Sequence, residues 1–407
     1  METLANQNPT NGSPVDRVDG LRVSVLVPTF NRVNYIAECL DSLLAQTMPA
    51  LEIIVIDDGS EDGTAELLKR YGQRIRYVRK ENGGKPTAVN LGLTLAQGDL
   101  IWIFDDDDVA LPHAISSRVA ALVASPDAGF VYSSHYYGSN GTDGKIVRGR
   151  LHQLPAHRPD SFFFELMKGC FFHLATALVR SDAYRAIGGF DTELLSSEDY
   201  DIQLRLAKAY PAAYCIEPSF IFRQHTGLRG SKTIRYGGAH RVTVFRKFDA
   251  RVGRKLRASL PLGDYLVPRL TEVSTALERR KALLARMTVM ASKGCITEMI
   301  EDLHSVLSLI QPEGLLCNTE QKEIAAAVST GYAANAIEDD WNDFKKHLEG
   351  LARSAAGRAA IRSIAAGLFQ LAKGYPAPIH VRVRLFKQAI IVLLLQSTGI
   401  RTRQKDY

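Results

Sequence analysis

Residues Ile101–Val109, IWIFDDDDV, place four consecutive carboxylates directly after an apolar and aromatic run. An apolar run of this length is typical of a buried strand, so the carboxylates would lie where the strand ends. Four adjacent like charges repel one another, and aspartate is depleted in strands. An isolated run of this kind is equally typical of a solvated acidic turn, and only its surroundings can distinguish such a turn from a binding site.

Strand-like and helix-like segments alternate around this stretch. Strand-like runs cover 23–27, 52–56, 75–78 and 100–104; helix-like runs cover about 34–46, a segment that starts near a Thr64 or Asp62 cap, and about 86–96. This alternation predicts a mainly parallel sheet with helices on both faces, which binds ligands beyond the carboxyl ends of its strands. Polar stretches follow three of the strands: PTFNR (28–32), DDGS (57–60) and DDDD (105–108). Their convergence favours a site over a solvated turn.

The composition is that of a globular protein large enough for one large domain or two ordinary ones. Of its 407 residues, 46% are hydrophobic and 23% are charged. The five cysteines are scattered without a CxxC pair, which argues against a disulfide framework or a zinc site and favours a reducing cytoplasm. Residues 1–20 are polar and lack the apolar core of a signal peptide, so they are predicted to be a disordered tail.

The second half of the chain changes character. From about residue 260 the sequence is rich in Ala, Leu, Glu and Lys with helical periodicity, which predicts a helical domain over 261–407 after a basic linker over 231–260. The apolar run AIIVLLL (389–395) is too short to span a bilayer. It is expected to be either a buried helix or an interfacial helix anchored by flanking cations.

Positive charge is concentrated in two segments, although the net charge is only +6. Residues 241–257 and 376–407 are strongly basic, and such segments can meet anionic lipid or an acidic glycan. Aromatic residues do not interleave with these cations as they do in nucleic-acid-binding proteins, so no nucleic-acid partner is expected. The expected location is the cytoplasm, with peripheral attachment to the anionic inner face of the membrane as an option.

The acidic run has the pattern of a metal-binding element. Asp105 and Asp107 are two residues apart, so on an extended segment their side chains point the same way, while Asp106 points the other way. Mg²⁺ and Mn²⁺ prefer oxygen ligands and commonly keep substrate phosphates in their coordination shell. This D-x-D pair is therefore a candidate site for a divalent cation and a bound diphosphate.

The other two strand exits suggest nucleotide recognition. Asp57 or Asp58 could accept a hydrogen bond from an imide N–H such as that of uracil, or could simply form an Asx turn. Phe30 offers a face on which a base can stack, and Arg32 offers a cation for phosphate. Either residue could equally serve packing or the surface.

A second acidic centre lies further along the chain, in SSEDYDIQLRLAK (196–208). Glu198 and Asp199 open an amphipathic helix, where acidic residues are favoured by the helix dipole alone. An inverting sugar transfer also needs one carboxylate to take the proton of the acceptor hydroxyl. A metal can stabilise the leaving diphosphate, so two separate carboxylate centres are the minimum equipment for this reaction.

Three segments carry a family resemblance: VSVLVPTFNR to DDGSEDGT (23–64), ENGGKPTAVN to FDDDDVALP (81–112), and AIGGFDTELLSSEDYDIQLRLA (186–207). They resemble the inverting family 2 glycosyltransferases of the GT-A fold, over about residues 21–226. The resemblance implies a GT-A catalytic domain, placed at 21–230, whose mixed and mainly parallel sheet is flanked by helices.

The resemblance also implies roles for individual residues. Asp199, beside Glu198, would be the catalytic base, and GGFD (188–191) would shape the acceptor side. Asp107, with Asp105, would bind the metal, and His225 in FRQHTG (222–227) would contact the metal or the diphosphate. The residues expected to contact the nucleotide-sugar are Thr29, Phe30, Arg32, Asp57, Asp58, Lys85, Asp105 and Asp106.

The expected function is transfer of a single sugar from a nucleotide-sugar, with UDP as the expected nucleotide, to a glycan or lipid-linked acceptor. Mn²⁺ or Mg²⁺ is the expected cofactor, and synthesis of a cell-surface polysaccharide or glycolipid is the expected setting. Processive relatives resemble one another in a Gln-x-x-Arg-Trp element that this sequence lacks. The alternatives are a non-catalytic sugar- or membrane-binding protein of the same fold and a nucleotidyltransferase, which would carry a Gly-rich basic loop after the first strand.

Overall fold

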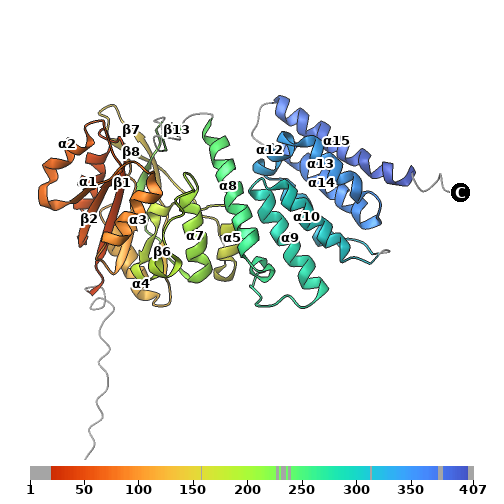
Figure 1. The fold of residues 1–407 in the computed structure, drawn as a ribbon, viewed down its shortest axis with the longest axis horizontal. Helices are drawn as coiled ribbons and strands as arrows, with labels where there is room; N and C mark the ends of the chain where they lie inside the picture. Colours follow the sequence, from red (N-terminus) through yellow and green to blue (C-terminus); the bar gives the residue numbers. More distant parts are fainter. Residues whose placement is uncertain are drawn as a thin grey trace, which may run out of the picture. The chain divides into compact units, whose positions relative to one another are not determined.

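The computed structural model describes residues 20–156, 158–225, 229–230, 235–236, 240–311, 314–374 and 379–401 (Figure 1). Residues 1–19 of the predicted disordered tail lie outside this set. The chain divides into two compact units. The first comprises residues 1–159 and 170–238, and the second comprises 160–169 and 239–407.

The first unit is built on a seven-stranded sheet in the order β10-β6-β9-β4-β1-β2-β3. Neighbouring strands are parallel except at β9, which is antiparallel to both β4 and β6. The strands are β1 (Val23–Thr29), β2 (Glu52–Asp57), β3 (Arg76–Arg79), β4 (Leu100–Ile103), β6 (Phe130–Tyr132), β9 (Leu178–Arg180) and β10 (Ala212–Tyr214). The register pairs Thr29 with Asp57 and Leu26 with Ile103, so β1, β2 and β4 end at one edge. The predicted mixed, mainly parallel sheet is confirmed.

Helices lie on both sides of this sheet (Figure 1). Because both faces are covered, every residue of β1 and of β4 is buried. Trp102 on β4 is completely buried; its indole N–H donates to the carbonyl of Ala175 at 2.8 Å, and the Arg118 guanidinium lies 4.0 Å from its ring centroid. The helices of this unit are α1 (Ile36–Leu44), α2 (Thr64–Leu68), η2 (Lys69–Arg74), α3 (Lys85–Leu95), α4 (Ala114–Ala124), η4 (Leu174–Thr176), α6 (Ser181–Ile187) and α7 (Glu198–Ala209).

A second, four-stranded sheet adjoins the acidic run, in the order β5-β11-β7-β8. Its strands are β5 (Val109–Ala110), β7 (Tyr136–Asn140), β8 (Ile146–Leu151) and β11 (Phe220–Arg223), and a separate pair joins β12 (Arg229–Gly230) to β13 (Arg235–Tyr236). Strand β5 begins at the residue after the four aspartates and pairs antiparallel with β11. The acidic run therefore links the two sheets. Sequence analysis did not predict this second sheet.

The second unit is helical, as predicted. It comprises η3 (Pro159–Ser161, of which Pro159 belongs to the first unit), α5 (Phe162–Lys168), α8 (His240–Ser259), η5 (Leu262–Tyr265), α9 (Ala276–Ser292), α10 (Ile296–Ser308), α11 (Asn318–Val328), α12 (Gly331–Asp339), α13 (Trp341–Leu351), α14 (Ala355–Gly374) and α15 (Ile379–Arg401).

Much of the segment predicted as a basic linker, 231–260, is helical. Helix α8 occupies 240–259 and belongs to the second unit. Its cations are paired within that unit: Arg254 Nε lies 2.5 Å from Glu298 Oε1, and Arg257 Nη2 lies 3.1 Å from the buried Asp302. Internal ion pairs, rather than an external anion, account for much of this basic segment.

Helix α15 divides the apolar run 389–395 between two faces. Ala389 and Val392 are buried, whereas Ile390 is 41% exposed. Val383 and Phe386, which lie at helical spacing from Ile390, are each 47% exposed. The expectation of a buried helix therefore describes only one side of α15. Within the described ranges, no helix is long and apolar enough to cross a membrane.

Candidate active site

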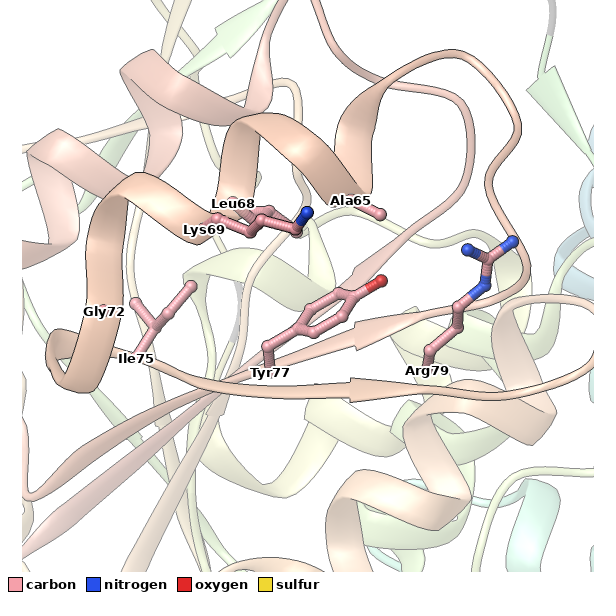
Figure 2. Close-up of a pocket in the computed structure, with 7 residues that line it drawn as sticks. All are labelled: Ala65, Leu68, Lys69, Gly72, Ile75, Tyr77 and Arg79. Carbon is pink, nitrogen blue, oxygen red and sulfur yellow. The ribbon is translucent and has the colours of Figure 1, made fainter.

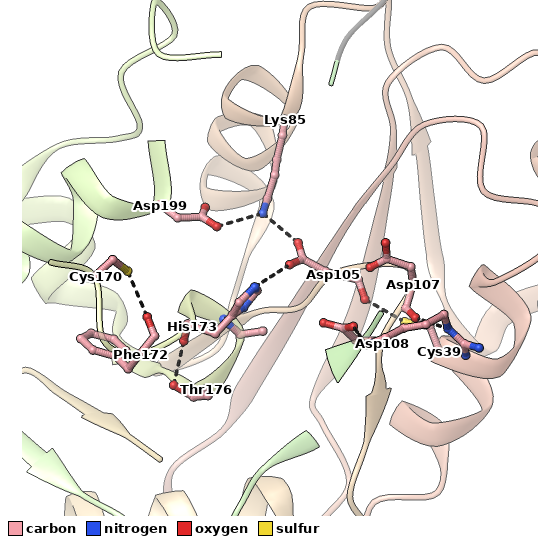
Figure 3. A network of polar contacts seen from close by, with 12 residues as sticks. Cys39, Lys85, Asp105, Asp107, Asp108, Cys170, Phe172, His173, Thr176 and Asp199 are labelled. Atoms are coloured by element: carbon pink, nitrogen blue, oxygen red, sulfur yellow. Dashed lines mark hydrogen bonds and ion pairs between the residues drawn. The ribbon is translucent and has the colours of Figure 1, made fainter. Parts of the chain in front are cut away.

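The first carboxylate of the acidic run, Asp105, joins the two acidic centres of the sequence through a lysine. Lys85 Nζ lies 2.8 Å from Asp105 Oδ1 and 3.3 Å from Asp199 Oδ2 (Figure 3). His173 Nε2 lies 3.9 Å from the other oxygen of Asp105. Burial opposes ionisation of Asp105, but Lys85 and His173 outweigh it and hold the pKa of this carboxyl below its usual value. The ammonium group thus bridges two carboxylates that are 94 residues apart in the sequence.

Local backbone geometry places Lys85 at this position. Lys85 is the first residue of α3 and follows Gly84. The φ of Gly84 is 88°, which residues other than glycine rarely adopt. The N–H of Gly84 donates to Asp58 Oδ2 at 2.7 Å, which fixes the loop just before the helix. The GGK sequence therefore presents a lysine from a helix start at the sheet edge.

The next two carboxylates both lie near Arg32, and the second also contacts a histidine. Arg32 Nε lies 3.5 Å from Asp106 Oδ1 and 4.0 Å from Asp107 Oδ2, and His225 Nε2 lies 2.8 Å from Asp107 Oδ2. Burial raises the pKa of Asp106 to about 7; Arg32 opposes this rise and the charge of Asp107 adds to it. Thr29, at the end of β1, is buried beneath this group.

Arg223 holds the backbone of the acidic run in place. Its side chain is completely buried; Nε donates to the carbonyl of Asp107 at 2.6 Å and Nη2 donates to Glu38 Oε2 at 2.5 Å. Nη1 donates to Asn140 Oδ1 at 2.5 Å, and the backbone N–H of Arg223 donates to Asp108 Oδ1 at 2.8 Å. The arginine of the FRQH motif is therefore a structural anchor two residues before His225.

The second acidic centre begins α7. Ser197, with a φ of 60°, turns the chain so that the helix starts at Glu198. Burial raises the pKa of Glu198 to about 8, and the charge of Asp199 adds to the rise. Asp199 Oδ1 is buried and has no hydrogen-bond partner in the part of the chain that the structure describes. This oxygen therefore has an unused acceptor position, whereas burial favours the protonated form of Glu198.

His173 is a site residue that sequence analysis missed. It precedes η4, and its Nδ1 accepts a hydrogen bond from the backbone N–H of Ala175 at 3.4 Å. Its other ring nitrogen, Nε2, faces Asp105. The motif resemblance had no counterpart for His173, and a lone histidine in GCFFHLAT carries no spacing signal.

Asp57 forms a local turn behind the predicted base site. Its Oδ1 accepts from the backbone N–H of Ser60 at 2.7 Å, and its Oδ2 accepts from the Tyr77 hydroxyl at 2.7 Å. Burial raises the pKa of Tyr77 to about 12, and Asp57 adds to this rise. These contacts match the Asx-turn alternative. Recognition of uracil by Asp57 remains a prediction.

A pocket of about 380 Å³ lies between α2, η2 and β3, on the other side of Tyr77 (Figure 2). It is lined by Ala65, Leu68, Lys69, Gly72, Ile75, Tyr77 and Arg79. Arg79 Nη2 donates to the carbonyl of Ser60 at 2.8 Å. No residue predicted for the site lines this pocket, and Arg79 connects its wall to the DDGS turn.

The carboxylate of Asp58 is saturated with hydrogen bonds. It accepts from Lys80 Nζ at 2.6 Å, Asn82 Nδ2 at 3.0 Å, Gly83 N at 3.0 Å and Gly84 N at 2.7 Å. A carboxylate offers about four acceptor positions. An imide N–H could therefore bind Asp58 only by displacing one of these donors.

The metal prediction fits Asp107 and His225 better than the D-x-D pair as a whole. Asp105 is engaged by Lys85, and no group of three or more His, Cys, Asp or Glu side chains within the described ranges is arranged to hold a metal ion. Asp107 and His225 together offer a carboxylate oxygen and an imidazole nitrogen. Mn²⁺ accepts such donors and would leave coordination positions for diphosphate oxygens.

The sheet, the acidic run at its carboxyl edge and the carboxylates that begin α7 define a GT-A glycosyltransferase domain. Residues 24–188 match the family model described as Glycosyl transferase family 2. This part of the first unit therefore matches family 2 of the glycosyltransferases, and the resemblance seen in the sequence is confirmed.

Curated relatives share this part of the chain. An uncharacterized glycosyltransferase of Rickettsia prowazekii (strain Madrid E) is 32% identical over 189 residues, which cover 44% of this chain and 57% of the relative. A hyaluronan synthase of Pasteurella multocida is 29% identical over 203 residues, which cover 49% of this chain and 20% of that protein. The match thus spans little more than half of the first relative and a fifth of the second.

Among solved structures, S. aureus TarS gives a TM-score of 0.49 at 16% sequence identity, covering 90% of this chain and 55% of that chain. S. aureus TarS 1–349 in complex with UDP-GlcNAc gives a TM-score of 0.48 at 15% identity, covering 95% of this chain and 93% of that chain.

We predict that Arg223→Met lowers the free energy of unfolding by about 3–5 kcal/mol, because it leaves buried polar partners without their cation. Urea unfolding in a Trp341→Phe background would follow Trp102, the remaining tryptophan, in the first unit. Arg22→Met is the matched control: its pair with Asp99 is 57% and 41% exposed, so the loss should stay below about 1 kcal/mol. Equal losses in the two variants would contradict the anchoring role.

We also predict that Glu198 makes the free energy of unfolding depend on pH. Its pKa is about 8 in the folded protein against an ordinary value of 4.5, so between these pH values the folded state keeps a proton that the unfolded state has lost. Stability should therefore fall as pH rises through this window and level off above it. Glu198→Gln should remove this fall, measured by urea unfolding from pH 5 to 9, whereas Glu66→Gln, at a 75% exposed side chain, should not.

Proposed function

We propose that this chain is a metal-dependent inverting glycosyltransferase that moves one sugar from a nucleotide-sugar to a glycan or lipid-linked acceptor, with UDP as the nucleotide. The observation that carries the proposal is the bridge from Asp105 through Lys85 to Asp199. It brings the acidic run, which is suited to a diphosphate and its cation, next to a carboxylate suited to a proton transfer. The family 2 match over residues 24–188 supports the same reaction class.

In this reaction Asp199 acts as the base. Its unpartnered Oδ1 takes the proton of the acceptor hydroxyl, while the hydroxyl oxygen bonds to the anomeric carbon. The bond from this carbon to the diphosphate breaks at the same time, and its electron pair leaves with the nucleotide. Glu198 keeps its proton at neutral pH, so the base centre carries one negative charge rather than two.

The cations around the acidic run serve the leaving group. Arg32, next to Asp106 and Asp107, is placed to meet the diphosphate. A divalent cation held by Asp107 and His225 would supply charge neutralisation to the departing diphosphate. Lys85 holds Asp199 in position from the donor side.

The names of two relatives suggest the biological setting. The regions shared with a hyaluronan synthase and a chondroitin synthase of Pasteurella multocida cover 49% and 46% of this chain. Both names denote enzymes that make polysaccharides. We therefore infer a role in the synthesis of a cell-surface polysaccharide or glycolipid.

The proposal predicts that UDP with Mn²⁺ raises the melting temperature, in a thermal-shift series with UDP, GDP, dTDP and CMP, each with and without Mn²⁺. Asp199→Asn should keep this shift and lose about 10²–10⁴-fold in sugar transfer, since a general base contributes that much. Asp182→Asn, at an exposed side chain, is the control and should retain transfer. A folded protein that responds to none of the nucleotides, or an active Asp199→Asn variant, would overturn the assignment.

We also propose that α15 attaches the chain peripherally to the anionic inner face of the membrane, where lipid-linked acceptors would lie. Val383, Phe386 and Ile390 present exposed apolar surface on one side of the helix. Residues 379–401 contain basic side chains and no Asp or Glu, so a second copy of α15 would bring like charges together, whereas anionic headgroups would attract them.

Binding of the full chain to vesicles of phosphatidylglycerol and phosphatidylcholine should depend on this face. Val383→Ser with Phe386→Ser should reduce co-sedimentation, and added salt should weaken binding. Leu277→Ser, at a 56% exposed leucine of α9, is the matched control and should bind normally. A parent protein that does not bind these vesicles at low salt would disprove the attachment.

A further inference from the structure

The loop between α6 and α7 is held by side chains from the two helices that carry Lys85 and Asp199. Asn90 lies on α3, five residues after Lys85, and Arg205 lies on α7, six residues after Asp199. At a rise of about 1.5 Å per residue, each lies roughly 7–9 Å along its helix from the Lys85–Asp199 ion pair. We call Asn90 and Arg205 the loop clamp.

Asn90 binds both backbone polar groups of one loop residue. Its Nδ2 donates to the carbonyl of Phe190 at 2.9 Å, and its Oδ1 accepts from the N–H of Phe190 at 2.7 Å. Phe190 is buried, so these groups need partners within the protein. The adjacent Gly189 is fitted to this contact, because a Cβ at this position would lie 2.5 Å from Asn90 Oδ1. A side chain at position 189 would therefore displace the amide.

Arg205 binds the preceding part of the loop through its guanidinium group. Nη1 donates to the carbonyls of Ile187 at 2.9 Å and Gly188 at 3.3 Å, and Nη2 donates to that of Gly189 at 2.9 Å. Nε donates to the buried carboxylate of Asp201 at 2.8 Å, which fixes the guanidinium group against α7. Charge-assisted hydrogen bonds of this kind are stronger than neutral ones. The loop is therefore joined to α3 by Asn90 and to α7 by Arg205.

The contact between Lys85 and Asp199 does not fix the base by itself. Nζ and Oδ2 lie 3.3 Å apart, and the two side chains are 28% and 27% exposed (Figure 3). Partly exposed ion pairs contribute little because solvent screens them. The clamp joins the same two helices through hydrogen bonds to backbone groups of one short loop. It thereby sets the distance between the ammonium group on α3 and the carboxylate on α7.

We propose that Asn90 and Arg205 are positioning residues that hold Asp199 at its distance from Lys85. Neither residue touches a reacting group, and each acts through the loop. This inference rests on the proposed glycosyltransferase function, in which Asp199 takes the proton, and adds to it the residues that place this base. A displacement of about 1 Å at a reacting group can lower a rate about 10²-fold, so loss of the clamp should slow the reaction without changing nucleotide binding.

The test measures UDP release by the full chain from UDP-glucose, UDP-galactose and UDP-N-acetylglucosamine with Mn²⁺, with water as the acceptor. Each rate is divided by the number of UDP-binding sites found by isothermal titration, so that misfolded protein is not counted. Asn90→Ala should lower this rate about 10²-fold and keep the parent's affinity for UDP. Gly189→Ala, which displaces the same amide, should have the same effect.

A double-mutant cycle separates positioning from general damage. If Asn90 acts only through the base, adding Asn90→Ala to Asp199→Asn should cause no further loss, because the group that it positions is already gone. A contact that only supports the fold would lower the rate by the same factor in both backgrounds. That result, or an Asn90→Ala protein with the parent's rate, would overturn the proposal.

Arg180 provides a matched control for Arg205 within the same unit. Its guanidinium group also donates to three backbone carbonyls, those of Leu122, Pro126 and Ala128. Arg180 pairs with Leu100, the first residue of β4, so it lies at the end of this strand opposite the acidic run. Arg205→Met should slow UDP release per binding site, whereas Arg180→Met should not. Equal losses in the two variants would contradict the positioning role.

A crystal structure of the Asn90→Ala protein tests the geometry without an assay of activity. Lys85 Nζ and Asp199 Oδ2 should no longer lie within ion-pair distance, and an unchanged contact would overturn the proposal. A parent protein that neither binds UDP nor releases it from any of the three donors would count against the glycosyltransferase function instead. The crystal structure would still decide whether the clamp places Asp199.

Discussion

The arrangement of the site depends on one buried cation, Arg223. Four adjacent aspartates at a sheet edge repel one another, and the desolvated surroundings strengthen that repulsion. Arg223, on β11, donates through its side chain to the carbonyl of Asp107 and to Glu38 of α1, and through its backbone N–H to the carboxylate of Asp108. With the backbone fixed in this way, the four carboxylates meet different and partly shared sets of partners.

These different contacts explain how the short acidic run can have several roles. Asp108 is structural, Asp107 faces His225, Asp106 faces Arg32, and Asp105 faces Lys85 and the base centre. A run of identical residues acquires distinct roles because the strand end, the turn and the second sheet present different partners. The same short run thereby faces His225 at Asp107 and, through Lys85, the base centre at Asp199.

The features that the sequence predicted are those with a local signal. The buried strands before Asp58 and Asp105 are short apolar runs, and their parallel order follows from the helices between them. Once the sheet is parallel, its carboxyl ends must meet at one edge, so the convergence of the polar stretches could be inferred without coordinates. The family motifs then added Asp199, which lies far along the chain.

The features that the sequence did not predict depend on contacts between distant residues. Strand β5 is two residues long and exists only because β11 pairs with it, about 110 residues later. His173 acquires its meaning from Asp105, to which no periodicity links it. The sequence predicted that the basic residues of α8 are available to an external partner. In the structure, Arg254 and Arg257 instead form ion pairs with glutamates of α10.

The excursion of the chain at 160–169 has a consequence for how the protein can be divided. Helix α5 belongs to the second unit, although both of its flanking segments belong to the first. Its buried residues, Phe163 and Leu166 among them, pack within that helical unit, where Arg269 lies over the Phe163 ring. A chain truncated after residue 238 would therefore contain α5 without the helical unit that buries its apolar residues. The two units are thus interleaved in the sequence. Neither can be inherited or expressed as one contiguous segment.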